Sequence, residues 1–304
     1  MKSLAITLFV LFTLAGHPAQ SQEMDVSVNV RGDRLHFHLL KGHGIPILFE
    51  AGGGDDSTVW NEIVKPIHQI TGATLITYDR AGFGRSELNP NELAIEMHGI
   101  QNGIEELEAA LSQLGYNHKI MLVAHSYGAL YATLYAARHP TLVKTAVFID
   151  GSSACWFNEE WMGDFVRERK SDDKPGVGHL GSYYQSANLP KTVELMKKTT
   201  FPSSVPVIDL VSEHPPFSDG KDIARWTDCH RQFANAQSNR QSTTVYGSGH
   251  YIYRDNPQLV IGAIVKAYSS IENRKAASEI MNRYLDHAIE IANEKGRQHG
   301  ALQP

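Results

Sequence analysis

Six short apolar runs, rich in Val, Ile, Leu and Thr, constrain the fold of this chain more than any other feature. They read IPILFEA, TLITYDR, KIMLVAH, TAVFID, VPVIDLV and STTVYG. Most are separated by segments of helix length, and such runs are typical of parallel strands that are buried on both faces and joined by crossover helices. The sequence therefore predicts an α/β fold with a mostly parallel central sheet flanked by helices.

The segments around these runs complete the predicted organisation. The stretch VSVNVRGDRLHFHLLKG from Val26 alternates about a turn at Arg31-Gly32-Asp33, which indicates an antiparallel hairpin. After Asp150 the strand rhythm stops, and the residues up to Val205 contain several aromatics and two or three possible short helices. We expect a core of residues 22–150 and 205–270, a helical insertion of residues 151–204, and a C-terminal helical extension of residues 271–304.

The first 21 residues have the three-part pattern of a secretory signal. One lysine precedes an apolar run from Leu4 to Leu14, and small and polar residues follow it. The run is too short to span a bilayer as a helix of the mature protein. The alternative is a buried strand or helix at the N-terminus. We predict an exported protein, periplasmic or secreted, without stable insertion in a membrane.

Charge and cysteine content narrow the function classes. The formal net charge of −5 suggests neither nucleic acid nor an anionic membrane as a partner. The two cysteines, Cys155 and Cys229, either form one disulfide in an oxidising compartment or remain as two buried thiols. The sequence leaves both alternatives open, and it leaves the oligomeric state open as well.

The stretch Ala124-His125-Ser126-Tyr127-Gly128 separates an expected strand, Lys119 to Val123, from an expected helix, Ala129 to His139. A serine on such a turn, with small residues two before and two after it, has the pattern of a nucleophile elbow. Ala124 replaces the usual glycine, which keeps the residue small but adds a methyl group. The alternative is an ordinary helix N-terminus capped by Ser126.

A nucleophilic serine needs a base and a source of hydrogen bonds for the oxyanion. His250 follows the last strand on the loop GSGHYIYRDNP and is the candidate base. The candidate oxyanion donors are the N–H groups of Gly53, from the EAGGG stretch, and of Tyr127. This glycine-rich loop lacks the lysine and Ser/Thr of a P-loop, so nucleotide binding is not expected.

The order of EAGGG, YDRAGFGRS, AHSYGALYA, VFIDG and GSGHYIYRDNPQLV resembles the α/β-hydrolase superfamily, and in particular its exported bacterial esterase-like and peptidase-like members. The resemblance covers residues 26–270. It implies that Tyr78-Asp79-Arg80 belongs to a loop that braces the site. It also implies that the insertion is a lid over the pocket, whose aromatic residues shape substrate choice: Trp156, Phe157, Trp161, Tyr183 and Tyr184.

The triad acid departs from the family pattern. The usual aspartate would align near Pro215, which cannot serve, and two carboxylates offer themselves instead. Glu213 lies on the same loop, whereas Asp150 ends the preceding strand. We prefer Asp150, because a strand end holds a side chain more rigidly than a proline-rich loop does.

Another candidate site is the pair His36 and His38, which share one face of a strand and could begin a metal site. The sequence places no third ligand, so we expect two surface residues of an edge strand and no metal.

The function that these residues predict is a secreted serine hydrolase that cleaves an ester, thioester or amide of a small molecule without a cofactor. Ser126 would attack the carbonyl, His250 would transfer the proton, and Asp150 or Glu213 would orient His250. The alternatives are a catalytically silent ligand-binding protein and cofactor-free C–C or peroxide chemistry on the same scaffold.

Overall fold

Eight strands form a single sheet in the computed structural model, which describes residues 22–169 and 180–300. The expected signal segment lies outside the described residues. The strands are β1 (Gln22–Val30), β2 (Asp33–Lys41), β3 (His43–Glu50), β4 (Ala73–Tyr78), β5 (Ile120–His125), β6 (Val143–Ile149), β7 (Val207–His214) and β8 (Arg240–Gly249). Each of the six apolar runs contributes one of the strands β3 to β8, as the sequence predicts.

The strand order is β1-β2-β4-β3-β5-β6-β7-β8. Strands β1 and β2 form the expected antiparallel hairpin, in which Arg31 and Gly32 take positive φ values of 53° and 91° at the turn. Strand β2 is also antiparallel to β4, and all other neighbours are parallel. The prediction of a mostly parallel sheet is confirmed.

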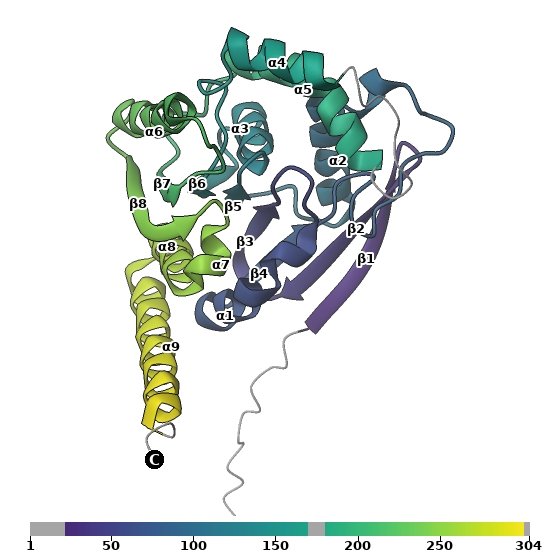
Figure 1. Cartoon of the computed structure of the whole chain (residues 1–304). Helices are drawn as coiled ribbons and strands as arrows, with labels where there is room; N and C mark the ends of the chain where they lie inside the picture. Colours follow the sequence, from purple (N-terminus) through teal and green to yellow (C-terminus); the bar gives the residue numbers. More distant parts are fainter. Residues whose placement is uncertain (1–21, 170–179, 301–304) are drawn as a thin grey trace, which may run out of the picture.

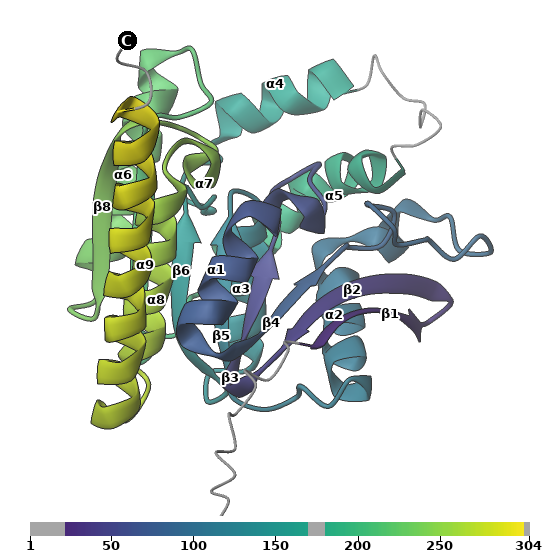
Figure 2. The ribbon, with the colours of Figure 1, turned by 90° about the horizontal axis from the view of Figure 1, so that it is seen from below.

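Helices cover both faces of the sheet (Figures 1 and 2). One face packs against α1 (Asn61–Thr71) and α8 (Pro257–Ser269), and α9 (Arg274–Gly300) lies against these two helices. The other face packs against α2 (Ile100–Gln113), α3 (Gly128–Arg138) and α6 (Gly220–Asn235). Successive residues of β5 alternate between the two faces. Met121 and Val123 join the core on the side of α1 and α8, and Leu122 and Ala124 join the core on the side of α2, α3 and α6.

The insertion contains α4 (Glu159–Arg169) and α5 (Leu180–Lys197). Figure 1 shows both helices above the carboxyl ends of the central strands. Three short helical turns complete the described structure: η1 (Ser57–Trp60), η2 (Ile95–His98) and α7 (Ile252–Asp255). None of the helices in the described ranges is both long enough and apolar enough to cross a membrane.

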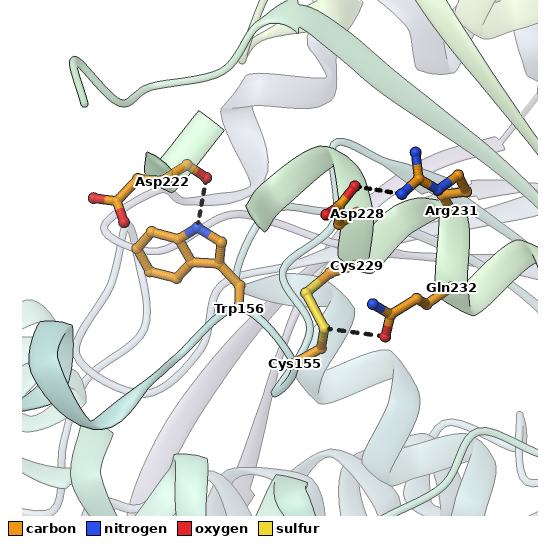
Figure 3. The surroundings of a disulfide bond; sticks show 7 residues. All are labelled: Cys155, Trp156, Asp222, Asp228, Cys229, Arg231 and Gln232. Atoms are coloured by element: carbon orange, nitrogen blue, oxygen red, sulfur yellow. Dashed lines mark hydrogen bonds and ion pairs between the residues drawn. A yellow bond between two sulfur atoms is a disulfide. The ribbon is translucent and has the colours of Figure 1, made fainter. Parts of the chain in front are cut away.

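A disulfide joins Cys155, at the start of the insertion, to Cys229 on α6 (Figure 3). The structure therefore decides between the two alternatives that the sequence left open. The bond closes a loop between residues 74 positions apart in the chain, so it restricts the unfolded chain strongly. It ties the insertion to a helix of the core.

The histidine pair does not lie on an edge strand, which corrects the expectation from the sequence. Strand β2 lies between β1 and β4, and His36 is buried between the carboxylates of Asp79 and Asp25, at 3.1 and 2.9 Å. His38 contacts the same Asp25 oxygen at 3.3 Å. Among the described residues, no group of three or more His, Cys, Asp and Glu side chains is arranged to hold a metal.

Glu106 on α2 is expected to make stability depend on pH. Burial, with Asp33 close by, raises the pKa of Glu106 to about 9. The folded protein then keeps this proton at pH values where the unfolded chain has lost it, so stability falls as pH rises from about 4.5 towards 9. We expect Glu106→Gln to raise the Tm at about pH 8 and to change it little at about pH 5. Thermal unfolding at both pH values measures this, and equal Tm values for the two proteins at the higher pH would contradict it.

Candidate active site

Ser126 lies on a tight turn between β5 and α3, as the elbow pattern predicts. Its φ of 50° is in the left-handed region, which a non-glycine residue adopts only when the surrounding structure enforces it. Gly128 allows the turn to pass close to β3, because a Cβ there would lie 2.5 Å from the carbonyl oxygens of Glu50 and Ala51. Ala124 is fully buried, so its extra methyl group is accommodated in the core.

Hydrogen bonds connect Ser126, His250 and Asp150 in one line. His250 Nε2 lies 2.9 Å from Ser126 Oγ, and His250 Nδ1 lies 2.6 Å from Asp150 Oδ2. A carboxylate only accepts hydrogen bonds, so Nδ1–H donates to Asp150. Nε2 is then free to accept the hydroxyl proton of Ser126, which is the arrangement that a general base requires.

Asp150 follows β6 directly and is completely buried, with a φ of 46°. Besides His250, its oxygens accept hydrogen bonds from the N–H and hydroxyl of Ser212, at 2.9 and 2.7 Å, and from Trp226 Nε1, at 2.9 Å. Burial alone would raise the pKa of Asp150, but the hydrogen bond and charge of His250, together with the donors on Ser212 and Trp226, hold it below its usual value. The carboxylate is therefore fixed, ionised and aimed at the imidazole.

Glu213 lies elsewhere. It is exposed near the end of β7, and its Oε2 accepts a hydrogen bond of 2.7 Å from the Gly247 N–H. No hydrogen bond among the described residues connects it to His250. Its position suits a role in joining β7 to β8, and the geometry favours Asp150 as the partner of His250.

The two candidate oxyanion donors are neighbours. A methyl group at Gly53 would lie 3.3 Å from Tyr127 Cβ and 2.7 Å from Gln185 Nε2 of α5, so the loop passes between the elbow and the insertion. Arg80 braces this loop, because its guanidinium donates to the carbonyl oxygens of Ala51 and Gly52. This bracing role is the one that the family resemblance implies for the Tyr78-Asp79-Arg80 segment.

The neutral side chain of His125 packs against the ring of His250 and donates a hydrogen bond to its backbone. Burial lowers the pKa of His125 to about 3, so its imidazole is uncharged at neutral pH. Its Nε2–H donates to the carbonyl oxygen of His250 at 3.0 Å, and the two ring centroids are 4.6 Å apart. The sequence placed His125 on the elbow turn but gave no indication of this contact.

The aromatic residues of the insertion separate into two groups. Trp156, Phe157 and Trp161 pack on one another, with centroids 4.8–5.4 Å apart. Trp156 is buried, and its Nε1 donates to the carbonyl oxygen of Asp222 (Figure 3). Tyr183 lies on α5, half-buried beside Tyr184, whose hydroxyl donates to Leu93 O.

Trp226 and Ser212 are the site residues that the sequence analysis missed. Trp226 connects the insertion to the acid, since its ring packs on Trp156 at 5.9 Å and its Nε1 donates to Asp150. It lies 76 positions after Asp150 on a different element. Only the fold brings the two together.

Three comparisons with known proteins agree with this architecture. The family profile described as the alpha/beta hydrolase fold matches residues 45–173. The uncharacterized protein YqjL of Bacillus subtilis (strain 168) is 24% identical over 246 residues, which are 81% of this chain and 92% of that protein. A proline iminopeptidase of Saccharolobus solfataricus is 31% identical over 43% of this chain and 38% of its own length. The solved structure of epoxide hydrolase CorEH superposes with a TM-score of 0.61 and 18% identity, over 83% of this chain and all of that one.

Proposed function

We propose that this chain, which has the α/β-hydrolase fold, is a serine hydrolase that cleaves an ester, thioester or amide bond of a small molecule. The observation that carries the proposal is the continuous line of hydrogen bonds from Ser126 through His250 to Asp150. In this reaction Ser126 Oγ attacks the carbonyl carbon while His250 Nε2 takes its proton.

The remaining steps follow from the same contacts. The N–H groups of Gly53 and Tyr127 would stabilise the oxyanion, and Asp150 would stabilise the imidazolium. His250 then protonates the leaving alcohol, thiol or amine, which leaves an acyl group on Ser126. Water, deprotonated by His250, attacks this acyl-enzyme and releases the acid, and the serine regains its proton. No step needs a metal or an organic cofactor.

Labelling with a fluorophosphonate tests the proposal. A serine activated by the histidine attacks phosphorus and expels fluoride, so intact-mass and peptide analysis should find one phosphonyl group on Ser126. Ser126→Ala should remain unlabelled. Failure of the folded protein to react would favour the silent binding protein over the enzyme.

We also propose that the mature enzyme works in the periplasm or outside the cell. The disulfide between Cys155 and Cys229 supports this, since disulfides form and persist in oxidising compartments. Export of a tagged full-length chain, compared with a chain that lacks residues 1–21, tests the proposal. Equal retention of both in the cytosol would contradict it.

We further propose that α4 and α5 form a lid over the substrate. The start of α5 supports this, because Gly181 N–H donates to the carbonyl oxygen of Gly82 and Gln185 lies against Gly53. The insertion thus contacts both the bracing loop and the oxyanion loop.

The two aromatic groups of the lid should respond differently to substitution. Trp156→Ala removes a buried ring and should lower the Tm by roughly 6–20 °C. Tyr183→Ala removes a half-buried ring and should instead change the ranking of ester substrates by acyl chain length, at nearly constant Tm. Melting curves and a panel of chromogenic esters measure both effects. If Tyr183→Ala ranked the esters as the unsubstituted protein does, Tyr183 would not contribute to substrate specificity.

A further inference from the structure

A cavity lies between α3, the end of α5, β6 and α6. Its volume is about 580 Å³, within the range of cavities that hold small organic ligands. Leu130 and Thr133 of α3 line one side, and Cys229 and His230 of α6 line another. Ser126, His250 and Asp150 are not among its lining residues. The proposed reaction does not use this space.

The apolar part of the lining is a set of aromatic rings. Phe148, Phe201 and Phe233 pack on one another, with centroids 5.4, 5.7 and 6.0 Å apart. Phe157 and Met196 add apolar surface from the insertion. This wall offers an apolar or aromatic group extensive contact at little entropic cost, because the rings already hold one another in place.

The polar part of the lining includes two cations, Arg240 and Lys197. Arg240 lies over the Phe233 ring at 4.1 Å and donates to the carbonyl oxygens of Phe233 and Phe201, at 3.2 and 3.0 Å. No carboxylate among the described residues pairs with it, and burial lowers the pKa of Arg240. Lys197 also lines the cavity, and it makes no ion pair within the described ranges. Within the part of the chain that the structure describes, no carboxylate neutralises either of these two cations.

Among the described lining residues the one carboxylate, Asp209, is engaged through one of its oxygens. Asp209 Oδ2 lies 2.8 Å from His230 Nδ1 and accepts a hydrogen bond of 3.0 Å from Ser242 Oγ. Although burial opposes it, the charge of Asp209 raises the pKa of His230 and so favours the imidazolium form, which offsets the charge of Asp209. The cavity therefore combines an aromatic wall with an excess of positive charge.

We propose that this cavity binds a small organic carboxylate with an apolar or aromatic body. The body lies against Phe148, Phe201 and Phe233, and the carboxylate is held at the side of Arg240 and Lys197. A half-buried guanidinium that has no anionic partner among the described residues gains from such a ligand, because charge-assisted hydrogen bonds are stronger than neutral ones. The proposal is independent of the serine chemistry.

Titration calorimetry on the full chain tests the proposal, with 4-phenylbutyrate as the probe and 4-phenylbutanol as its uncharged control. We expect saturable binding of one 4-phenylbutyrate per chain, at least tenfold tighter than that of the alcohol. Arg240→Gln should weaken binding of 4-phenylbutyrate at least tenfold. Arg231→Gln is the matched control: this arginine is exposed on α6 and pairs with Asp228, and its loss should change binding less than twofold.

Two further variants keep the test decisive if Arg240→Gln does not fold. Lys197→Gln removes an exposed charge, and Thr200→Trp fills the exposed rim of the cavity, so each should weaken binding in a folded protein. His250→Ala should leave binding unchanged. Absence of binding, equal binding of acid and alcohol, or loss of binding in His250→Ala alone would overturn the proposal, the last because it places the probe in the candidate active site.

Discussion

Replacing Ser126 or His250 by alanine is expected to lower kcat/KM for ester hydrolysis by at least about a thousandfold. Ser126 supplies the atom that bonds to the substrate, and His250 is the base 2.9 Å from that atom. Because the two act as one unit, the double variant should be little worse than either single variant. Initial rates on a chromogenic ester measure the effect, and circular dichroism establishes that each variant is folded.

Ser112→Ala and His118→Ala provide matched controls, since both residues are exposed and precede β5, whose other end leads into the elbow. Their rates should stay within about twofold of the unsubstituted protein. If a folded Ser126→Ala variant kept a comparable rate, the ester would be cleaved by another group, and the assignment of the nucleophile would be wrong.

The second large effect is expected at the acid. Asp150→Asn should lower kcat by up to about ten-thousandfold, because an amide neither fixes the Nδ1–H tautomer of His250 nor stabilises the imidazolium. Glu213→Gln should change kcat only severalfold, since Glu213 contacts the Gly247 N–H and not the imidazole. Measured pH–rate profiles of both variants separate a loss of the base from a loss of stability.

The comparison between the two carboxylates is informative in either direction. If Glu213→Gln lost most of its kcat while Asp150→Asn lost little, the loop after β7 would have to rearrange when substrate binds. In that case the close contact of 2.6 Å between His250 and Asp150 would belong to a resting state only.

The sequence predicts the sheet and the serine turn well, because both depend on local patterns. An apolar run that is buried on both faces needs no knowledge of its neighbours to be identified as a strand, and the elbow is specified by consecutive residues from Ala124 to Gly128. His250 could be found because it follows the last strand on a short loop.

What the sequence could not supply depends on long-range neighbours. No single apolar run specifies the order of the strands. The sequence therefore predicts an edge position for His36, although β1 pairs with the outer side of its strand. The support that Trp226 gives to Asp150 arises only when α6 packs against β7 and β8. The disulfide was likewise undecided, since the distance between Cys155 and Cys229 is set by the fold and not by their spacing in the chain.

The positions of Ser126 and Asp150 on neighbouring strands have a consequence for the order in which the chain folds. Strand β5, helix α3 and strand β6 are consecutive, so short loop closures bring the serine and the carboxylate onto neighbouring strands. His250 comes from 124 residues beyond the serine and 100 beyond the carboxylate, after the insertion and after α6. Two of the three residues can thus be in place early, whereas both hydrogen bonds of the line form only when β8 docks and brings the proton acceptor, His250. Through most of folding, Ser126 would therefore lie on its turn without a general base. The chain would become able to cleave bonds only when His250 reaches the serine in the last step.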